Sequence, residues 1–178
     1  FLLSQDTLAQ WALEKYAAPR VALFLVRRDA GLAMQLGNYY FGGRARDLVR
    51  AERAYQKAVR ADPKILWGHY QLARIYFIKG DYKKAVEEIN KELEANPENL
   101  RSLYVRGLIY GFTGRFAQAE EDFRRFTQWA PKEWAGYNDL AWILSKRGKY
   151  EDAEKIIQTA LGAVPDAKSN SWLWNSLG

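Results

Sequence analysis

The stretch LARIYFIKGDYKKAVEEINKELEANP, residues 72–97, holds two helical patterns separated by a turn. Apolar side chains recur at helical spacing on both sides of Gly80-Asp81. Glycine favours the left-handed conformation that ends a helix, and Asp81 is a good N-cap for the helix that follows. Pro97 ends the second pattern, because proline cannot continue a helix. The stretch therefore predicts one helix before the turn and a second helix over 82–95.

The same pattern returns every 34 residues along most of the chain. Four of the five prolines keep this interval, and so do small and aromatic residues near the helix crossings and turns. The recurring sets are Pro63, Pro97, Pro131 and Pro165; Ala51, Ala85, Ala119 and Ala153; Gly80, Gly114 and Gly148; Tyr82, Phe116 and Tyr150; and Ala73, Gly107 and Ala141. A fixed interval of this length predicts repeated helix–turn–helix units.

The recurring small residues have a packing explanation. Two helices that cross closely leave room for little more than a methyl group at the crossing. Large side chains, such as Ile89, Phe123 and Ile157, recur in the second helices and can fill the space beside the small residues. A single helix pair cannot cover its own apolar faces, so the units are expected to stack on one another.

These residues resemble the tetratricopeptide repeat. Residues 72–97, 106–131 and 140–165 each carry its hallmark positions, and residues 36–63 match with two additional residues near Gly42-Gly43-Arg44. The resemblance covers about 30–165. It implies an all-α fold, a right-handed α-solenoid of stacked helix–turn–helix 34-residue repeats. Two positions depart from the family pattern, which prefers a small residue in place of Glu92 and a leucine in place of Arg106.

The repeat pattern divides the chain into six segments. Residues 1–29 are expected to form a helical N-terminal cap, with a degenerate extra repeat as the alternative. Four repeats follow, and WLWNSLG at the end resembles the opening of a fifth. The expected repeats are 30–65, 66–99, 100–133 and 134–167, with 168–178 as the first helix of a truncated fifth repeat. Because the chain begins with Phe1 and not Met, we expect a fragment or a processed form.

The composition excludes most catalytic chemistry. There are no cysteines and one histidine, so thiolate nucleophiles, cysteine-ligated metals and multi-histidine metal sites are excluded. No nucleotide-binding or hydrolase motif is present. We therefore expect no catalytic residues, cofactor or metal, and no enzyme. His69 is expected to be a packing or solvent-edge residue, and the paired acids at 87–88, 120–122 and 151–152 are expected in the opening turns of the second helices, where carboxylates favour the helix dipole.

The resemblance places a binding surface on the concave face, lined mainly by the first helices of the repeats. Aromatic and arginine side chains dominate this peptide-binding groove, and these residue types concentrate binding energy. Only Asn38 fits the lysine–asparagine set with which some family members hold a C-terminal carboxylate. The groove residues are Asn38, Trp67, Tyr70, Arg74, Phe77, Arg101, Tyr104, Leu108, Asn138 and Trp142. The alternative is that Tyr70, Tyr104 and Trp142 pack against neighbouring helices and each other.

The positive charge is concentrated near the beginning of the chain. The formal net charge is +6, of which residues 1–64 contribute +5. One set of basic side chains, at steps of three and four, would form a stripe on the outer face of the first repeat: Arg46, Arg50, Arg53, Lys57 and Arg60. A solvated surface is the first interpretation, and an anionic membrane surface or a nucleic acid is the alternative. The aromatic residues do not interleave with this stripe, which disfavours a nucleic-acid platform.

The sequence thus favours a non-catalytic scaffold that binds a peptide or helix segment of another protein in its groove. Self-association is the second hypothesis, since Trp172, Leu173 and Trp174 of the truncated repeat would be exposed and could dock on a second copy. An adaptor for a membrane surface or a nucleic acid, through the basic stripe, is the third. The compartment stays open, with the cytoplasm and the soluble arm of a membrane-anchored protein as the two possibilities.

Overall fold

A computed structural model describes residues 3–42 and 46–163, and these residues contain ten helices and no strand. By their contacts the residues divide into two units, residues 1–97 and residues 98–178. The helices of the first unit, here called unit 1, are α1 (Gln5–Tyr16), α2 (Pro19–Leu25), α3 (Ala30–Phe41), α4 (Leu48–Ala61), α5 (Gly68–Ile78) and α6 (Tyr82–Ala95). Those of unit 2 are α7 (Leu100–Phe112), α8 (Phe116–Trp129), α9 (Trp134–Lys146) and α10 (Tyr150–Ala163).

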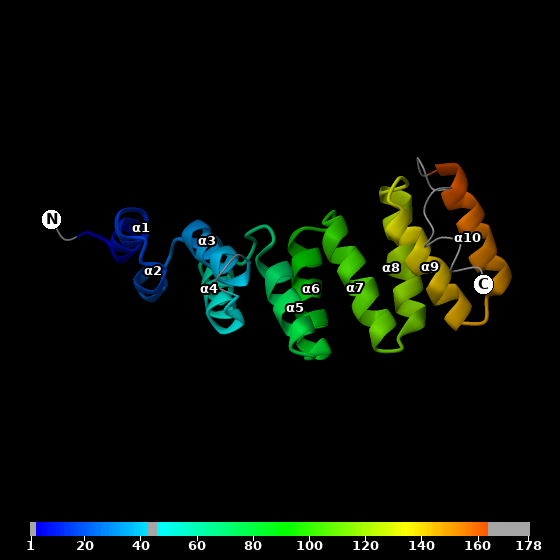
Figure 1. Ribbon diagram of the computed structural model, residues 1–178, viewed down its shortest axis with the longest axis horizontal. Coiled ribbons are helices and arrows are strands. Elements are labelled where there is room, and N and C mark those ends of the chain that lie inside the picture. Colours follow the sequence, from blue (N-terminus) through cyan, green and yellow to red (C-terminus); the bar gives the residue numbers. More distant parts are fainter. Residues whose placement is uncertain (1–2, 43–45, 164–178) are drawn as a thin grey trace. The chain divides into compact units, whose positions relative to one another are not determined.

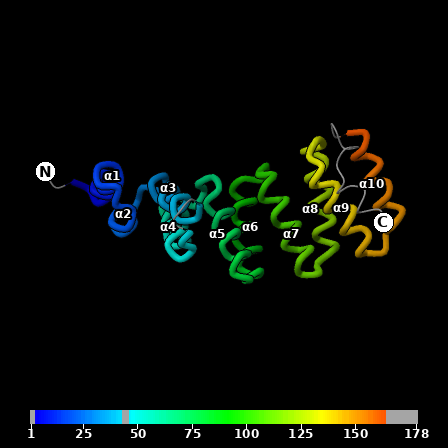
Figure 2. The backbone as a smooth tube through the Cα atoms, in the orientation of Figure 1, coloured from blue at the N-terminus to red at the C-terminus, as the bar shows by residue number. Residues whose placement is uncertain are grey.

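Within each unit the helices pack in sequence order, as Figure 1 shows. In unit 1 each helix from α1 to α6 contacts the next one along the chain, and in unit 2 the same holds from α7 to α10. The backbone reverses direction at each short turn (Figure 2). The all-α, stacked helix–turn–helix fold expected from the sequence is therefore confirmed within each unit. Gly43 and Arg44, where the first repeat has two additional residues, and the predicted first helix of a fifth repeat over 168–178 lie outside the described residues.

The helix ends follow the signals in the sequence. Gly80, Gly114 and Gly148 have φ angles of 75°, 73° and 74°, so each occupies the left-handed region after a first helix. Asp81 caps α6 by accepting a hydrogen bond from the backbone N–H of Lys84. Pro19 opens α2, where its missing N–H costs nothing. Local sequence therefore determines where most helices begin and end.

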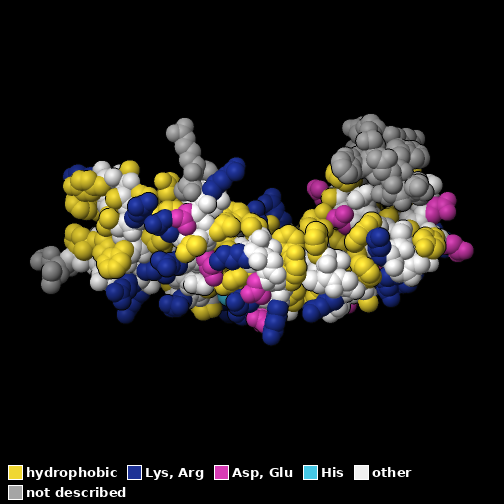
Figure 3. Space-filling view, turned by 60° about the horizontal axis from the view of Figure 1, so that its bottom comes forward, with side chains coloured by type: hydrophobic (Ala, Val, Ile, Leu, Met, Phe, Trp, Pro, Cys, Tyr) yellow, Lys and Arg dark blue, Asp and Glu magenta, His cyan; other side chains and the backbone are white. Residues whose placement is uncertain are grey.

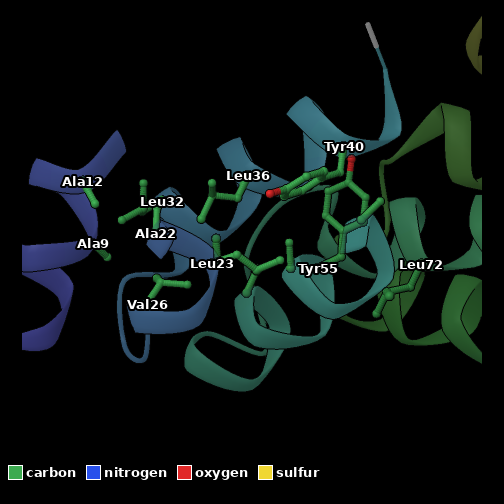
Figure 4. Close-up of a cluster of buried hydrophobic side chains, with 14 of the residues drawn as sticks. Ala9, Ala12, Ala22, Leu23, Val26, Leu32, Leu36, Tyr40, Tyr55 and Leu72 are labelled. Atoms are coloured by element: carbon green, nitrogen blue, oxygen red, sulfur yellow. The ribbon is translucent and has the colours of Figure 1, made fainter. Parts of the chain in front are cut away.

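The core of unit 1 is built at the crossing of α3 and α4. The ring of Tyr55 is fully buried against Gly37, among the leucines of α3 and residues of α2 and α5 (Figure 4). A Cβ atom at Gly37 would overlap the Tyr55 ring. In unit 2 the same arrangement joins Gly107 to Phe123, whose Cε1 atom lies 2.9 Å from the position a Cβ would take. The predicted packing of a small residue against a large one is therefore observed at Gly107 and Phe123, and Gly37 and Tyr55 show the same arrangement in unit 1.

We predict that Gly37→Ala destabilises the protein, although alanine favours a helix over glycine. The added methyl group must displace a buried aromatic ring, and such overpacking costs about 1–3 kcal/mol. Gly31→Ala is the matched control in the same helix, because its nearest neighbour would lie 3.4 Å away. The control should be neutral or stabilising by up to about 1 kcal/mol. Urea denaturation checks the pair, and equal midpoints for the two variants would contradict the packing described here.

Candidate functional site: the first-helix faces

The first helices of unit 1 present a connected set of aromatic and polar side chains. The Arg74 guanidinium lies 4.5 Å from the ring centroid of Phe41 and 5.7 Å from that of Tyr70. Tyr70 in turn packs edge-on against Trp67, with centroids 5.3 Å apart. All four side chains are partly buried, so each keeps some surface toward solvent. We call this set the unit 1 face; it joins α3 to the beginning and middle of α5.

Polar contacts hold the rest of the unit 1 face. The hydroxyl of Tyr55 donates a hydrogen bond of 2.8 Å to Oδ1 of Asn38, which lies exposed on α3. Burial raises the pKa of Tyr55 to about 12, so the hydroxyl stays a donor at neutral pH. Arg74 also donates to Oε1 of Gln71 at 3.0 Å. The predicted groove residue Phe77 lies further along α5, 5.6 Å from the ring of Tyr82.

The backbone at Trp67 is strained. Its φ angle is 73°, in the left-handed region that a bulky side chain seldom adopts. The fully buried carboxylate of Glu92, on α6, accepts hydrogen bonds from the backbone N–H groups of Trp67 and Tyr70, at 3.0 and 3.2 Å. Glu92 thus replaces the missing side-chain N-cap of α5 and fixes the residue that starts the unit 1 face. Strain held in this way is common at functional sites.

Unit 2 presents a second set of residues, here called the unit 2 face. Tyr104 on α7 packs against Phe123 and Phe126, with centroids 5.7 and 5.0 Å away. Its hydroxyl donates a 2.6 Å hydrogen bond to Asp139 on α9. Tyr104 therefore serves the packing of the unit more than it faces solvent, in line with the alternative interpretation of this residue.

On the unit 2 face Trp142 is exposed, and Asp139 lies partly buried on the same helix. Trp142 is 45% exposed and packs edge-on against Phe116, with Lys146 5.6 Å from its ring centroid. Asp139 accepts hydrogen bonds from Tyr104 and from Asn138. Burial raises its pKa, although these two hydrogen bonds oppose the shift. Among the described residues Asp139 has no cationic partner.

The remaining predicted groove residues are dispersed over unit 2. Leu108 is partly buried and Asn138 lies beside Asp139, whereas Arg101 is exposed at the beginning of α7. Sequence reasoning missed Asp139, because a single acid within a helix looks like an ordinary solvated residue. Its partner Tyr104 lies 35 positions away, close to one repeat length, and this spacing is the signal that could have found the pair.

The basic stripe is only partly helical. Arg46 precedes α4 and has a φ angle of 38°, so the prediction that it belongs to the stripe is wrong. The helix begins only after Asp47, which caps it through the N–H of Arg50. Arg53 and Arg60 are exposed, as expected for an outer face. Lys57 is instead half-buried and donates a 2.7 Å hydrogen bond to the carbonyl of Val26.

Two sequence models of the tetratricopeptide repeat match the chain, one over residues 54–87 and the other over residues 113–172. Together these ranges cover more than half of the chain. The chain belongs to the tetratricopeptide repeat family. Proteins of this family are typically non-catalytic scaffolds for protein–protein interaction, and the fold supports protein partners for this chain in general.

Solved structures of MamA have the same fold. One MamA crystal structure gives a TM-score of 0.74 at 19% identity and covers 89% of each chain. A second gives 0.73 at 16% identity, over 92% of this chain and 95% of that one. MamA from Desulfovibrio magneticus RS-1, residue 41 to the end, gives 0.68 at 17% identity, over 89% and 92%. No curated protein matches the sequence.

The two departures from the tetratricopeptide repeat pattern carry buried charge. Glu92 stands where the family prefers a small residue and caps α5, as described above. Arg106 stands where the family prefers leucine, and it forms two hydrogen bonds of 2.8 and 2.7 Å to the buried carboxylate of Asp122. Each departure is therefore matched by polar partners on the neighbouring helix of the same repeat.

The prediction that the paired acids lie in opening helix turns is wrong for most of them. Only Glu151 and Asp152 occupy a first turn. Glu88 lies in the middle of α6 and pairs with Lys91 and with Nδ1 of His69, both at 2.7 Å. His69 is therefore a buried, paired residue, in agreement with its predicted packing role. Glu88 therefore connects a second helix to the first helix of its repeat and lies outside the turn where it would favour the helix dipole.

Glu120 is the most highly connected of these acids. It accepts hydrogen bonds from Arg124 on its own helix, from Arg147, and from Lys149 at 3.1 Å, the last two lying at the end of the next first helix. Its side chain is 9% exposed. Burial alone would raise the pKa of Glu120, but the hydrogen bonds from Arg124, Lys149 and Arg147 outweigh burial and hold it below the ordinary value of 4.5.

Metal-binding groups and membrane-spanning helices were both sought in the part of the chain that the structure describes. Within residues 3–42 and 46–163 there is no group of three or more His, Asp or Glu side chains placed to hold a metal ion. Each helix in the same ranges is too short or too polar to cross a membrane. Trp172, Leu173 and Trp174 lie outside the described residues, so self-association through them stays a prediction.

We predict that Glu120→Gln destabilises unit 2 by about 1–3 kcal/mol at neutral pH, because charged hydrogen bonds to three cations are lost. The folded-state pKa of Glu120 is lowered, so its contribution is complete above the unfolded pKa and is lost as the pH falls through the folded pKa. The difference from the unmodified protein should therefore shrink below about pH 4.5. Glu121→Gln, on the exposed side of the same helix, is the control. Chemical denaturation across pH checks both variants; a constant difference at all pH values would contradict this role.

Proposed function

We propose that the protein is a non-catalytic scaffold that binds a peptide or helix segment of a partner protein on its first-helix faces. The observation that carries this proposal is the unit 1 face, where Arg74 lies between two aromatic rings and Trp67 is held in a strained conformation. This face is built by helices whose positions are fixed by the core beneath them. A partner would therefore meet a preformed surface.

A preformed aromatic surface favours binding for two reasons. Receptor side chains that are already ordered lose little conformational entropy when a ligand arrives. Trp, Tyr and Arg are also the residues that most often dominate binding energy at protein interfaces. On the unit 1 face Trp67, Tyr70 and Arg74 combine both properties, because each is fixed by its neighbours and still partly exposed. We infer an apolar or aromatic partner segment for this face.

The unit 2 face suits a cationic side chain next to an apolar one. Asp139 carries a partly desolvated carboxylate whose hydrogen-bond donors among the described residues, Tyr104 and Asn138, are neutral, and a cation would compensate the cost of its burial. Trp142 lies on the same helix and is exposed, so it can pack against the aliphatic part of an incoming arginine or lysine. A partner segment with a basic residue beside an apolar residue therefore fits this face.

We predict that peptides selected from a random displayed library bind through these faces. In fluorescence polarisation, Tyr70→Ala and Arg74→Ala should each weaken peptides that bind unit 1 by about tenfold or more, the loss typical of a binding hot spot. Trp67→Ala and Trp142→Ala extend the series to both faces. Asp139→Asn should weaken only those peptides that contain arginine or lysine.

Matched controls lie on the second helices. Tyr150 is 70% exposed on α10, and Arg125 is exposed on α8 beside Trp129. Tyr150→Ala and Arg125→Ala should leave every selected peptide within about twofold of its original affinity, because surface changes away from an interface have small effects. Peptides that lose affinity with the control variants and keep it with Tyr70→Ala, Arg74→Ala and Trp142→Ala would contradict the proposed function.

A further inference from the structure

A hollow of about 420 Å³ lies in unit 1 between α2 and α4. None of the residues that line it belongs to the unit 1 face. Helix α2 contributes Arg20, Leu23 and Phe24, and α4 contributes Arg50, Arg53 and Lys57. Four of these six side chains are cationic. Figure 3 shows Lys and Arg side chains, in dark blue, gathered over this N-terminal part of the molecule. The sequence stripe found only the α4 side of this cluster, because Arg20 belongs to a segment outside the repeat pattern.

The charge of the hollow is largely uncompensated. Arg50 pairs with Asp47, and Lys57 is bound by a backbone carbonyl. Within the described residues, Arg20 and Arg53 have no ion-pair partner. Burial, together with the nearby charges of Arg27 and Arg60, lowers the pKa of Lys57, although Asp6 opposes this shift. A bound anion would relieve the repulsion among these cations.

Large apolar side chains are exposed on α2 and on its neighbour α1. Phe24, which lines it, is 79% exposed, and Val21 on the same helix is 49% exposed. The neighbouring helix α1 exposes Trp11 and Tyr16, whose rings pack edge-on 4.6 Å apart. Yellow apolar side chains accordingly stand beside dark blue basic ones at this end of Figure 3. Tryptophan, tyrosine and basic residues together are the composition that favours the headgroup region of a membrane.

We propose that this hollow binds the phosphate groups of anionic phospholipids at a membrane surface, with Phe24 entering the headgroup region. The cations of α2 and α4 supply the electrostatic attraction, and the exposed side chains of Phe24 and Val21 supply apolar contact. A nucleic acid fits less well, because Phe24 is the one aromatic side chain among the six that line the hollow, whereas a single strand stacks successive bases on several rings. The site is separate from the unit 1 face and does not depend on the proposed scaffold function.

The test is sedimentation of the protein with mixed phosphatidylglycerol–phosphatidylcholine vesicles and with pure phosphatidylcholine vesicles. We expect binding to the anionic vesicles only. The double variant Arg20→Gln, Arg53→Gln should lower the partition coefficient by about 25-fold, at about fivefold for each cation removed. Phe24→Ser should lower it by about tenfold, as expected for the loss of one partly inserted aromatic side chain.

The matched control is Lys83→Gln, Lys155→Gln, which removes the same charge from exposed positions on α6 and α10. It should change the partition coefficient by less than about twofold. An equal loss in the control would overturn the proposal, because net charge alone would then explain binding. If the arginine variant unfolds, Phe24→Ser still tests the proposal, because Phe24 is a surface residue. Unchanged vesicle binding by folded Phe24→Ser would overturn the proposal. Tight binding of a polyuridine oligonucleotide with no vesicle binding would also overturn it.

Discussion

The close crossing of the two helices in each repeat is the constraint on which the rest of the structure depends. Where the first helix carries glycine, as at Gly37 and Gly107, the second helix places the ring of Tyr55 or Phe123 directly against its backbone. A fixed distance between two helices also fixes their rotation, and so decides which residues of the first helix face outward. The orientation of the binding faces therefore depends on this buried contact between the helices.

Buried carboxylates provide a second, polar set of contacts, both within a repeat and between neighbouring repeats of unit 2. Glu92 on α6 accepts a hydrogen bond at the start of α5, and Asp122 on α8 pairs with Arg106 on α7. Glu120 on α8 accepts a hydrogen bond from Arg147 at the end of α9. Each carboxylate has several donors, which is the condition under which a buried charge is tolerated. Of these carboxylates, Glu92 contacts the unit 1 face directly, through the backbone of Trp67 and Tyr70.

The sequence predicts most of the backbone and a smaller part of the site. Glycine, aspartate and proline determine helix ends through local conformation, so Gly80, Asp81 and Pro19 could be assigned from the sequence. The position of Arg46 could not be assigned, because Arg46 keeps the helical spacing of the basic stripe although it precedes Asp47, the residue that caps the helix.

Contacts between residues that are far apart in the sequence limit what else could be predicted from it. The hollow between α2 and α4 joins residues whose spacing gives no sign of contact, and the pair of Tyr104 with Asp139 is marked only by a spacing close to one repeat length. The same holds for Glu92, which looks like a tolerated departure in the sequence and is a capping residue in the structure. Side-chain chemistry could be read from the sequence at these positions, but the partner of each group could not.

The most direct test of the account is an NMR titration of the protein with a selected peptide, observed through backbone amide shifts. We expect shifts concentrated in the first helices, at residues of the unit 1 face or the unit 2 face, with the helical content unchanged, because the surface exists before the partner arrives. Shifts concentrated in the second helices α4, α6, α8 and α10, or a general rearrangement of the amide spectrum, would contradict it.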